Sequence, residues 1–260
     1  MALVEVVSHC PTSEIDLVNT STAAELFRNI EDRLKAGMGF AVATLNLDHV
    51  VKLRTDAQFR RAYLRHNHVV ADGNPVVWLR RLAGRPVDLV TGSDMVDPLM
   101  EMAARLGTPV AFLGATAESL EAAADRLKAR FPKLNIVARI SPSFDFDPTG
   151  AEADEALKRV KNSGAKLCLL ALGAPKQELL AAGALDSVPG CGFVSIGAGL
   201  DFIAGSQRRA PLWMRRVALE WLWRLANAPR RLARRYADCF GVLPGMAIQA
   251  VSMRRRDSAP

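Results

Sequence analysis

The stretch HVVADGNPVVW, residues 68–78, decides how this chain folds. Its first four residues are an apolar run of the kind that forms a buried strand. The run stops at Asp72 and Gly73, and a helical pattern opens behind Asn74 and Pro75. In open α/β sheets, ligands bind at the carboxyl ends of the strands. We therefore interpret Asp72 as a carboxylate exposed in a cleft, where it acts as a general base.

Residues 1–21 are irregular, and strand-like and helix-like segments alternate from there to residue 206. The apolar runs predict strands, and the helical pattern and its caps predict helices between them, with Ser93 expected to cap the fourth helix. This alternation predicts an α/β fold, Rossmann-like, with a largely parallel sheet flanked by helices. The predicted strands are 40–46, 68–72, 109–114, 134–140, 166–172 and 192–196, and the predicted helices are 21–35, 55–66, 75–83, 93–106, 118–131 and 152–162.

Five predicted strands end in polar or glycine-rich turns. Because the carboxyl ends of parallel strands meet at one edge of a sheet, these turns are expected to form a binding site. Two alternatives stay open: Thr44 and Asn46 only cap the next helix, and Lys176 and Gln177 only begin an ordinary one. The predicted binding residues are Thr44, Asn46, Asp72, Gly73, Gly114, Gly173, Lys176, Gln177, Gly197, Gly199 and Asp201.

Two other patterns correspond to different classes of enzyme. Gly197 and Gly199 form a partial match to a dinucleotide loop, but the next glycine, Gly205, does not have the spacing of the third. The chain is therefore not expected to be a nicotinamide enzyme. The DxD pair Asp145 and Asp147 lies in a polar loop and defines an alternative, a metal-dependent transferase.

The remaining ligand-like pattern is the HxH pair His66 and His68, which has no third ligand nearby. We expect neither a metal nor a cofactor. The four cysteines show no CxxC spacing, which fits a reducing compartment. The start of the chain does not have the pattern of a signal peptide, and no apolar run reaches the roughly 18 residues that span a bilayer.

The positive charge of the chain belongs to its last part. Residues 207–260 contain twelve arginines, no lysine and three acids, whereas residues 1–206 carry a net charge of −2. Three of the four tryptophans lie between residues 210 and 226, where apolar residues follow one helical stripe. Arginines beside such a stripe are typical of a helix on an anionic membrane surface. A helix pair docked on the domain is the alternative, and no motif accompanies the charge to indicate nucleic acid.

This charge asymmetry gives a division of the chain into three parts. Residues 1–206 are predicted to form the catalytic α/β domain, residues 207–245 a C-terminal Arg/Trp-rich helical appendage that associates with the membrane, and residues 246–260 a disordered tail.

Several motifs in one order resemble the WecG/TagA/CpsF glycosyltransferases, known as glycosyltransferase family 26. The resemblance covers residues 40–236. The motifs that carry it are ATLN (43–46), ADG (71–73), VTGSD (90–94), LGAPKQE (172–178), IGAGLDFIAG (196–205), EWLWRL (220–225) and PRRLARRY (229–236).

The resemblance implies an inverting, metal-independent transfer of a hexosyl or N-acetylhexosaminyl group from a UDP-sugar to a polyprenyl-diphosphate-linked sugar. It places the enzyme peripherally on the cytoplasmic face of the bacterial inner membrane, in the assembly of surface polysaccharide. The matching positions are Asp72 as the base, Thr44 as a sugar-site hydroxyl, Gln177 as a substrate contact, and Arg224, Arg231 and Arg234 as the arginines that engage the diphosphate and the membrane.

One departure from the family pattern concerns Leu89, which stands where members commonly carry an arginine. The missing cation supports a second hypothesis, a non-catalytic membrane-associated factor that binds a nucleotide-sugar. The donor sugar, the acceptor linkage and the oligomeric state stay open.

Overall fold

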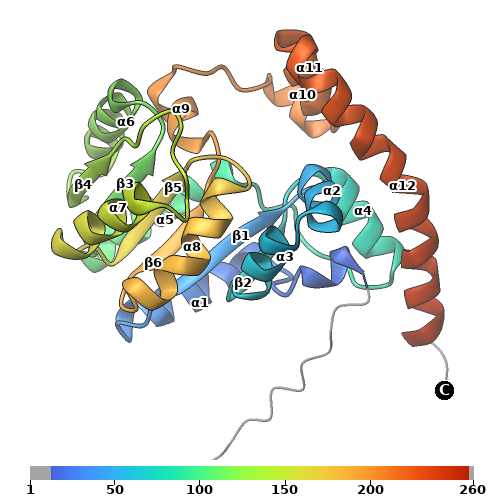
Figure 1. Cartoon of the computed structure of the whole chain (residues 1–260), viewed down its shortest axis with the longest axis horizontal. Coiled ribbons are helices and arrows are strands. Elements are labelled where there is room, and N and C mark those ends of the chain that lie inside the picture. The colour runs from blue at the N-terminus through green and yellow to red at the C-terminus, as the bar shows by residue number, and fades with distance from the viewer. Residues whose placement is uncertain (1–12, 258–260) are drawn as a thin grey trace, which may run out of the picture.

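The computed structural model describes residues 13–257, apart from the side chains of Arg216 and Arg231, and it contains one six-stranded sheet between layers of helices (Figure 1). The strands lie in the order β2-β1-β6-β5-β3-β4, and every neighbouring pair is parallel. This confirms the predicted Rossmann-like fold. The strands are β1 (Phe40–Leu45), β2 (His68–Ala71), β3 (Val110–Gly114), β4 (Ile136–Ile140), β5 (Leu167–Ala171) and β6 (Gly192–Ser195).

Helices cover both faces of the sheet, which is why the strands read as continuous apolar runs. In β1, Phe40 and Val42 face one layer, and Ala41 and Ala43 face the other. The first layer contains α1 (Ala23–Lys35), α5 (Gly92–Leu106), α6 (Ala117–Arg130) and the short α9 (Gly199–Ala204). The second contains α7 (Ala151–Asn162) and α8 (Lys176–Ser187) and, towards β2, the helices α2 (Leu47–Thr55), α3 (Ala57–Leu64) and α4 (Asn74–Leu82), with η1 (Glu14–Leu17) beside them.

Two local predictions differ from the structure. Residues 47–55 form α2, for which the sequence analysis predicted no helix. The Asn46 side chain starts it by accepting a hydrogen bond from the His49 N–H at 3.1 Å. Ser93 does not cap α5. Thr91 does, because its hydroxyl accepts from the Asp94 N–H at 3.2 Å.

The C-terminal appendage contains α10 (Leu212–Arg216), α11 (Glu220–Asn227) and α12 (Pro229–Asp257). The single stripe expected over residues 210–226 is therefore divided between two short helices. The division falls at Ala218, whose φ of 60° is incompatible with a continuous right-handed helix. Figure 1 shows α10 and α11 beyond one end of the sheet, and α12 running down the side of the molecule.

Helix α12 corrects the prediction of a disordered segment from residue 246. It continues to Asp257, and only residues 258–260 lie outside the described part of the chain. Met246, Ala250 and Met253 recur at the i, i+4, i+7 spacing of a helix face and are buried in the same core as α2 and α4. The Arg85 guanidinium also contacts the Asp257 carboxylate at 2.7 Å. The end of α12 is thus part of the folded body.

The turn between α1 and β1 offers a test of this packing. Gly39 donates to the Pro189 carbonyl at 2.8 Å, and a Cβ atom at position 39 would overlap that oxygen. We predict that Gly39→Ala lowers the free energy of unfolding by about 2–3 kcal/mol, because the backbone must move. The measurement is urea unfolding.

The matched control is Gly183→Ala, in the exposed face of α8, where an added Cβ meets nothing within 4 Å. Alanine is the better helix former, so this variant is expected to gain about 0.5–1 kcal/mol. Equal unfolding curves for Gly39→Ala and the wild type would contradict the close packing at the turn.

Candidate active site

The five polar strand ends lie in a row along the carboxyl edge of the sheet. The order β2-β1-β6-β5-β3 brings together the turns that follow these strands, as their sequence predicted. Asp72 and Gly114 stand at the two ends of the row, four strand spacings or about 19 Å apart. From β1 the chain goes to β2 on one side and then crosses to β3 on the other. An open α/β sheet binds its ligand where the connections diverge in this way.

Asp72 is held by the neighbouring strand. Its backbone N–H donates to the Leu45 carbonyl at 2.8 Å, and its half-buried carboxylate accepts hydrogen bonds from the side chains of Thr44 and Asn46. The amide oxygen of Asn46 is occupied by the His49 N–H, so its NH₂ group is the part that faces Asp72. Asn46 therefore caps a helix and orients the carboxylate at the same time.

The environment makes Asp72 a stronger base than an ordinary aspartate. Burial raises its pKa to about 6, and the charge of Glu220 acts in the same direction. The hydrogen bonds from Asn46 and Thr44 and the charge of Arg224 lower the pKa but do not cancel the effect of burial. At neutral pH the group is mostly ionised and still able to take up a proton.

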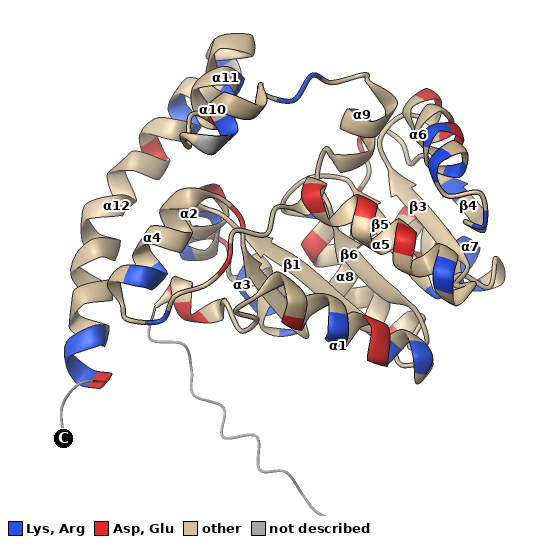
Figure 2. Cartoon of the chain, turned by 180° about the vertical axis from the view of Figure 1, so that it is seen from behind, with Lys and Arg blue, Asp and Glu red and all other residues tan. Residues whose placement is uncertain are grey.

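The appendage brings charge to this edge from more than a hundred residues away. Glu220 and Arg224 lie on α11 and influence the titration of Asp72. The connection to α10 is fixed by Arg209, whose guanidinium contacts both oxygens of Asp94 at 2.5 and 3.0 Å. In Figure 2 this connection and α10–α12 carry blue segments, which in this part of the chain are all arginines.

The glycines of the edge have two different roles. At Gly173 and Gly197 the φ values are 71° and 55°, and an added Cβ would meet nothing within 4 Å. These two turns keep open space in which an anion can approach the backbone closely. Gly73, Gly114 and Gly199 lie at the same edge, and a Cβ atom there would approach neighbouring protein atoms.

Gln177 and Asp201 are engaged with the protein itself. Gln177 is 3% exposed, and its amide bonds to the Gly197 N–H at 3.1 Å and to Glu178 at 2.8 Å. The carboxylate of Asp201 accepts from Ser206 and Gln207. Their predicted roles as substrate contacts stay predictions, as does that of Lys176, which donates to the Phe144 carbonyl at 3.4 Å.

The family of the chain follows from a comparison with family models. The model of the glycosyl transferase WecG/TagA/CpsF family matches residues 13–258. The chain belongs to the WecG/TagA/CpsF family of glycosyltransferases. The matched region includes α10–α12, so the appendage belongs to the family domain. Membership implies transfer of a glycosyl group from a nucleotide-sugar donor to a lipid-linked acceptor in surface polysaccharide biosynthesis.

The structure describes the side chains of two of the three arginines that the sequence analysis singled out in the C-terminal helices. Arg224 and Arg234 are exposed on α11 and α12, and the side chain of Arg231 lies outside the described part of the structure.

Leu89 forms an isolated parallel bridge with Ala71, one residue before Asp72, and is 43% exposed. The position of the missing family arginine is therefore at the site. Among the described residues, no helix is long and apolar enough to cross a bilayer.

A buried polar network beneath the Asp72 site was not predicted. The Tyr63 hydroxyl donates to the Thr44 carbonyl at 3.2 Å and contacts His49 Nδ1 at 2.5 Å. Because the phenol has one proton, His49 Nδ1 carries the hydrogen in that contact. Burial lowers the pKa of His49 to about 3, so the imidazole is neutral. No sequence spacing marks these residues, which come from α2 and α3.

The metal-ligand patterns of the sequence are used for local hydrogen bonds. Asp147 accepts from the backbone and hydroxyl of Thr149 at 2.9 and 2.8 Å. His66 and His68 bond through Nδ1 to Ala62 and Thr20. No group of three or more His, Cys, Asp or Glu side chains suited to a metal ion occurs among residues 13–257.

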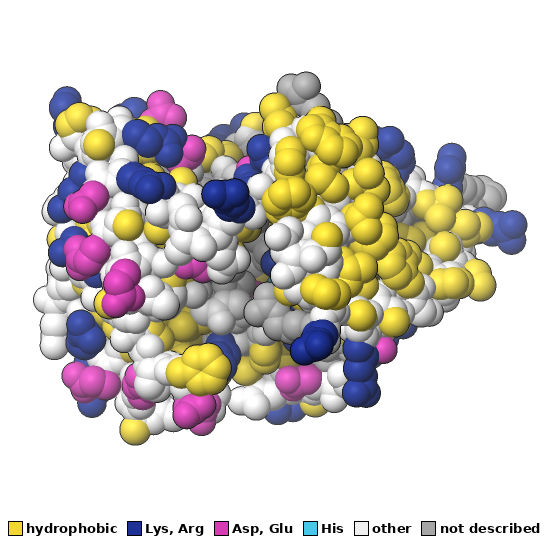
Figure 3. Space-filling view, turned by 90° about the horizontal axis from the view of Figure 1, so that it is seen from above, with side chains coloured by type: hydrophobic (Ala, Val, Ile, Leu, Met, Phe, Trp, Pro, Cys, Tyr) yellow, Lys and Arg dark blue, Asp and Glu magenta, His cyan; other side chains and the backbone are white. Residues whose placement is uncertain are grey.

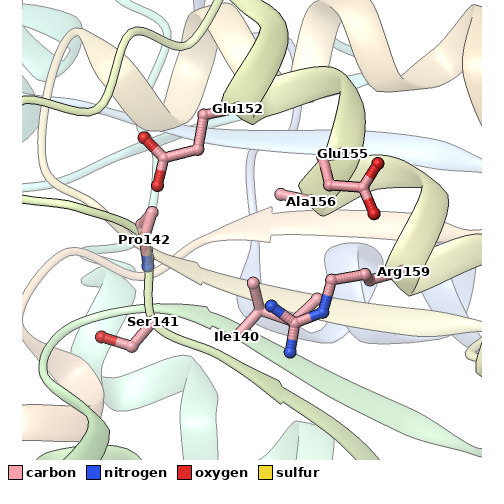
Figure 4. Close-up of a pocket in the computed structure, with 7 residues that line it drawn as sticks. All are labelled: Ile140, Ser141, Pro142, Glu152, Glu155, Ala156 and Arg159. Atoms are coloured by element: carbon pink, nitrogen blue, oxygen red, sulfur yellow. The ribbon is translucent and has the colours of Figure 1, made fainter.

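A pocket of about 60 Å³ lies between the end of β4 and α7, with Glu155 and Arg159 on its helical side (Figure 4). Strand β4 is at the opposite border of the sheet from β2. The pocket is therefore not part of the Asp72 site.

The raised pKa of Asp72 predicts a stability effect with a definite sign. The ionised carboxylate is less favourable in the folded protein than in the unfolded chain, so it destabilises the fold above pH 6 and not below pH 4. We predict that Asp72→Asn raises the free energy of unfolding by about 1–3 kcal/mol at pH 8. The gain disappears as the pH falls towards 4, and urea unfolding at several pH values measures it.

Asp94→Asn is the control with the opposite sign. Burial acts to raise the pKa of Asp94, but the hydrogen bonds from Arg209 and Thr91 outweigh it and hold the pKa below its usual value. This variant should be less stable than the wild type at pH 8, and the difference should shrink in acid. The same sign for both variants at pH 8 would contradict the assignment.

Proposed function

We propose that this glycosyltransferase moves a hexosyl or N-acetylhexosaminyl group from a UDP-sugar to a polyprenyl-diphosphate-linked sugar, with inversion at the anomeric carbon and Asp72 as general base. The observation that carries the proposal is a carboxylate at the carboxyl edge of the sheet, oriented by Thr44 and Asn46 and with a pKa of about 6. A base titrating near its working pH is suited to proton transfer.

The reaction needs one base and one displacement. The acceptor hydroxyl oxygen forms a bond to the anomeric carbon, while the bond from that carbon to the diphosphate oxygen breaks and UDP leaves with the electron pair. The hydroxyl proton passes to Asp72. A single displacement inverts the anomeric centre and needs Asp72 only as a base.

The leaving UDP gains negative charge, which groups at the same edge can stabilise. The Gly173 turn can present its backbone N–H groups to the diphosphate, whereas the Gly197 N–H is held by Gln177 and the Gly197 turn contributes open space for the ligand. Arg224 adds a cation from α11, close enough to Asp72 to influence its titration. In this proposal these groups act without a metal ion, and the chelator experiment below tests that feature.

The acceptor side of the proposal rests on the appendage. Its apolar patch consists of five exposed side chains, Leu212, Trp213, Val217, Leu222 and Phe240, which are 41–62% exposed. Figure 3 shows hydrophobic side chains gathered on α10–α12 and a hollow between them and the α/β body. Tryptophan and arginine side by side are typical of a helix on an anionic lipid surface. A lipid-linked acceptor would enter the hollow from that surface.

Asp72→Asn tests the base assignment. We expect transfer from UDP-sugars to a short-chain lipid-diphosphate sugar to fall by about 10²–10⁴-fold, while the Kd for UDP changes little, because the base contacts the acceptor and not the nucleotide. For the wild type, kcat/KM should rise with pH through about 6, the pKa of Asp72. Radiolabelled transfer and calorimetry provide the readouts.

Asp147→Asn is the control, because this exposed carboxylate belongs to the alternative metal site and lies on the turn before α7. Full activity of the control in a chelator supports transfer without a metal, whereas loss of wild-type activity in the chelator favours the DxD alternative. Unchanged turnover of Asp72→Asn would exclude it as the base. UDP binding without transfer from any donor would favour the non-catalytic factor that the exposed Leu89 suggests.

Trp213→Glu tests the membrane surface. The indole is 62% exposed, and removing its burial in the lipid interface should weaken binding to vesicles containing phosphatidylglycerol by about tenfold. Truncating the appendage is a poorer test, because α12 carries core residues. Cosedimentation at low and high salt measures the binding, and the arginine contribution should weaken with salt.

Met38→Glu is the matched control, since Met38 is 51% exposed in the turn before β1, at the opposite edge of the sheet. It should bind vesicles like the wild type. Equal binding by Trp213→Glu and Met38→Glu would remove the appendage from the membrane contact.

A further inference from the structure

Glu178 is a buried acid that the proposed mechanism does not use. It lies in the first turn of α8 and is 0% exposed. Its Oε1 accepts from the Gln177 amide at 2.8 Å, and its Oε2 is buried without a hydrogen-bond partner among the described residues. A buried carboxyl group with one oxygen unpaired is unfavourable for stability. Such a local conflict is expected at a functional site.

The partner of Glu178 joins two turns of the candidate active site. Gln177 lies in the first turn of α8, where its N–H donates to the Gly173 carbonyl of the turn after β5 at 3.1 Å, and its Oε1 accepts from the Gly197 N–H of the turn after β6 at 3.1 Å. The strands β5 and β6 are neighbours, so this amide fixes the two glycine turns relative to each other. Both turns are the ones with open space above the backbone.

Glu178 determines which way the Gln177 amide points. An amide can place either its oxygen or its NH₂ group towards Gly197, and only the oxygen accepts from an N–H. The carboxyl Oε1 of Glu178 accepts from the NH₂ group, which leaves the amide oxygen for Gly197. Without that acceptor, the amide is free to turn and release the Gly197 N–H.

The groups around Glu178 do not indicate a different role for its carboxyl group. Lys52 and Asp48 of α2 and Tyr63 of α3 are the charged and titratable groups that interact with it. Tyr63 is committed to the Thr44 carbonyl. Burial raises the pKa of Glu178 to about 7, and the carboxyl group has an oxygen that accepts from the Gln177 amide in either protonation state.

We propose that Glu178 is a positioning residue of the donor site: it orients the Gln177 amide and thereby sets the Gly173 and Gly197 turns that receive the diphosphate of the donor. The inference rests on the proposed function for the identity of the ligand. The geometric part, in which Glu178 acts on the Gly197 turn through Gln177, does not need a ligand.

Glu178→Met and Glu178→Gln distinguish the effect of the acceptor oxygen on Gln177 from the effect of side-chain size. Methionine has a similar length but does not replace the carboxyl acceptor, whereas the amide oxygen of glutamine does. We expect Glu178→Met to raise the KM for the donor and the Kd for UDP by about tenfold, with kcat at saturating donor within about threefold of the wild type. Glu178→Gln should restore both constants to within about threefold. Asp72→Asn is expected to do the opposite, because it should lower the rate of transfer and leave the Kd for UDP little changed.

Amide hydrogen exchange gives a readout that needs neither ligand nor turnover. Glu178→Met should speed the exchange of the Gly197 N–H by about tenfold, and Glu178→Gln should not. Combining Glu178→Met with Gln177→Met should add no further effect on KM, because both changes break the same chain of contacts. Leu180→Val, a buried apolar change on the same helix, is the control for general loosening.

The outcomes distinguish the two proposals. Unchanged KM, Kd and Gly197 exchange in folded Glu178→Met would overturn the positioning role, and so would equal effects of Leu180→Val. If Glu178→Met does not fold, Glu178→Asp takes its place, since the shorter acid keeps the charge but not the reach, and the same shifts are expected. Faster Gly197 exchange in a protein whose wild type binds no UDP would support the positioning and overturn the proposed donor.

Discussion

The candidate site depends on the balance at one carboxylate. Burial at the carboxyl edge raises the pKa of Asp72, and the hydrogen bonds from Thr44 and Asn46 limit that rise to about 6. Without the hydrogen bonds, the pKa would be higher and a smaller fraction of the group would be ionised at neutral pH. With full exposure it would be a weak base of ordinary pKa. General-base catalysis by Asp72 requires both burial and hydrogen bonding.

The fold places the residues that follow neighbouring strands next to Asp72. Strands β1 and β2 are parallel neighbours, so the residues after them lie side by side although they are far apart in the chain. Asn46 can orient Asp72 because it also starts α2, which fixes its amide. The appendage adds the charges of Glu220 and Arg224, and it is held in place by α12, whose buried face joins the core around α2 and α4.

The sequence was sufficient for the sheet and for the identity of the strand ends. Buried parallel strands leave a strong signal, because each is an apolar run that stops at glycine or a polar residue. The signal was not sufficient for α2 and for the end of α12. Helix α2 begins directly after Asn46, and its start at an Asx cap was interpreted only as an alternative to a site. Helix α12 continues past Pro244, although a proline normally ends a helix.

The rest of the site could not be predicted because it depends on tertiary contacts. Glu220 lies in a motif that the sequence analysis quoted, yet nothing in the spacing indicated that its charge reaches Asp72. Gln177 was predicted as a substrate contact, and only the structure shows that its amide joins Glu178 to the Gly197 turn. Burial of Tyr63 and His49 is likewise a property of the packing of α2 and α3.

The most direct test of the central claim is the titration of Asp72 itself. The ¹³C resonance of its carboxyl carbon can be assigned by comparison with a variant that lacks the acid, and then followed from pH 3 to pH 9. The structure predicts a midpoint near 6. A midpoint at the ordinary aspartate value of about 3.9 or below would show a carboxylate that is solvated or paired, and would contradict its role as the base.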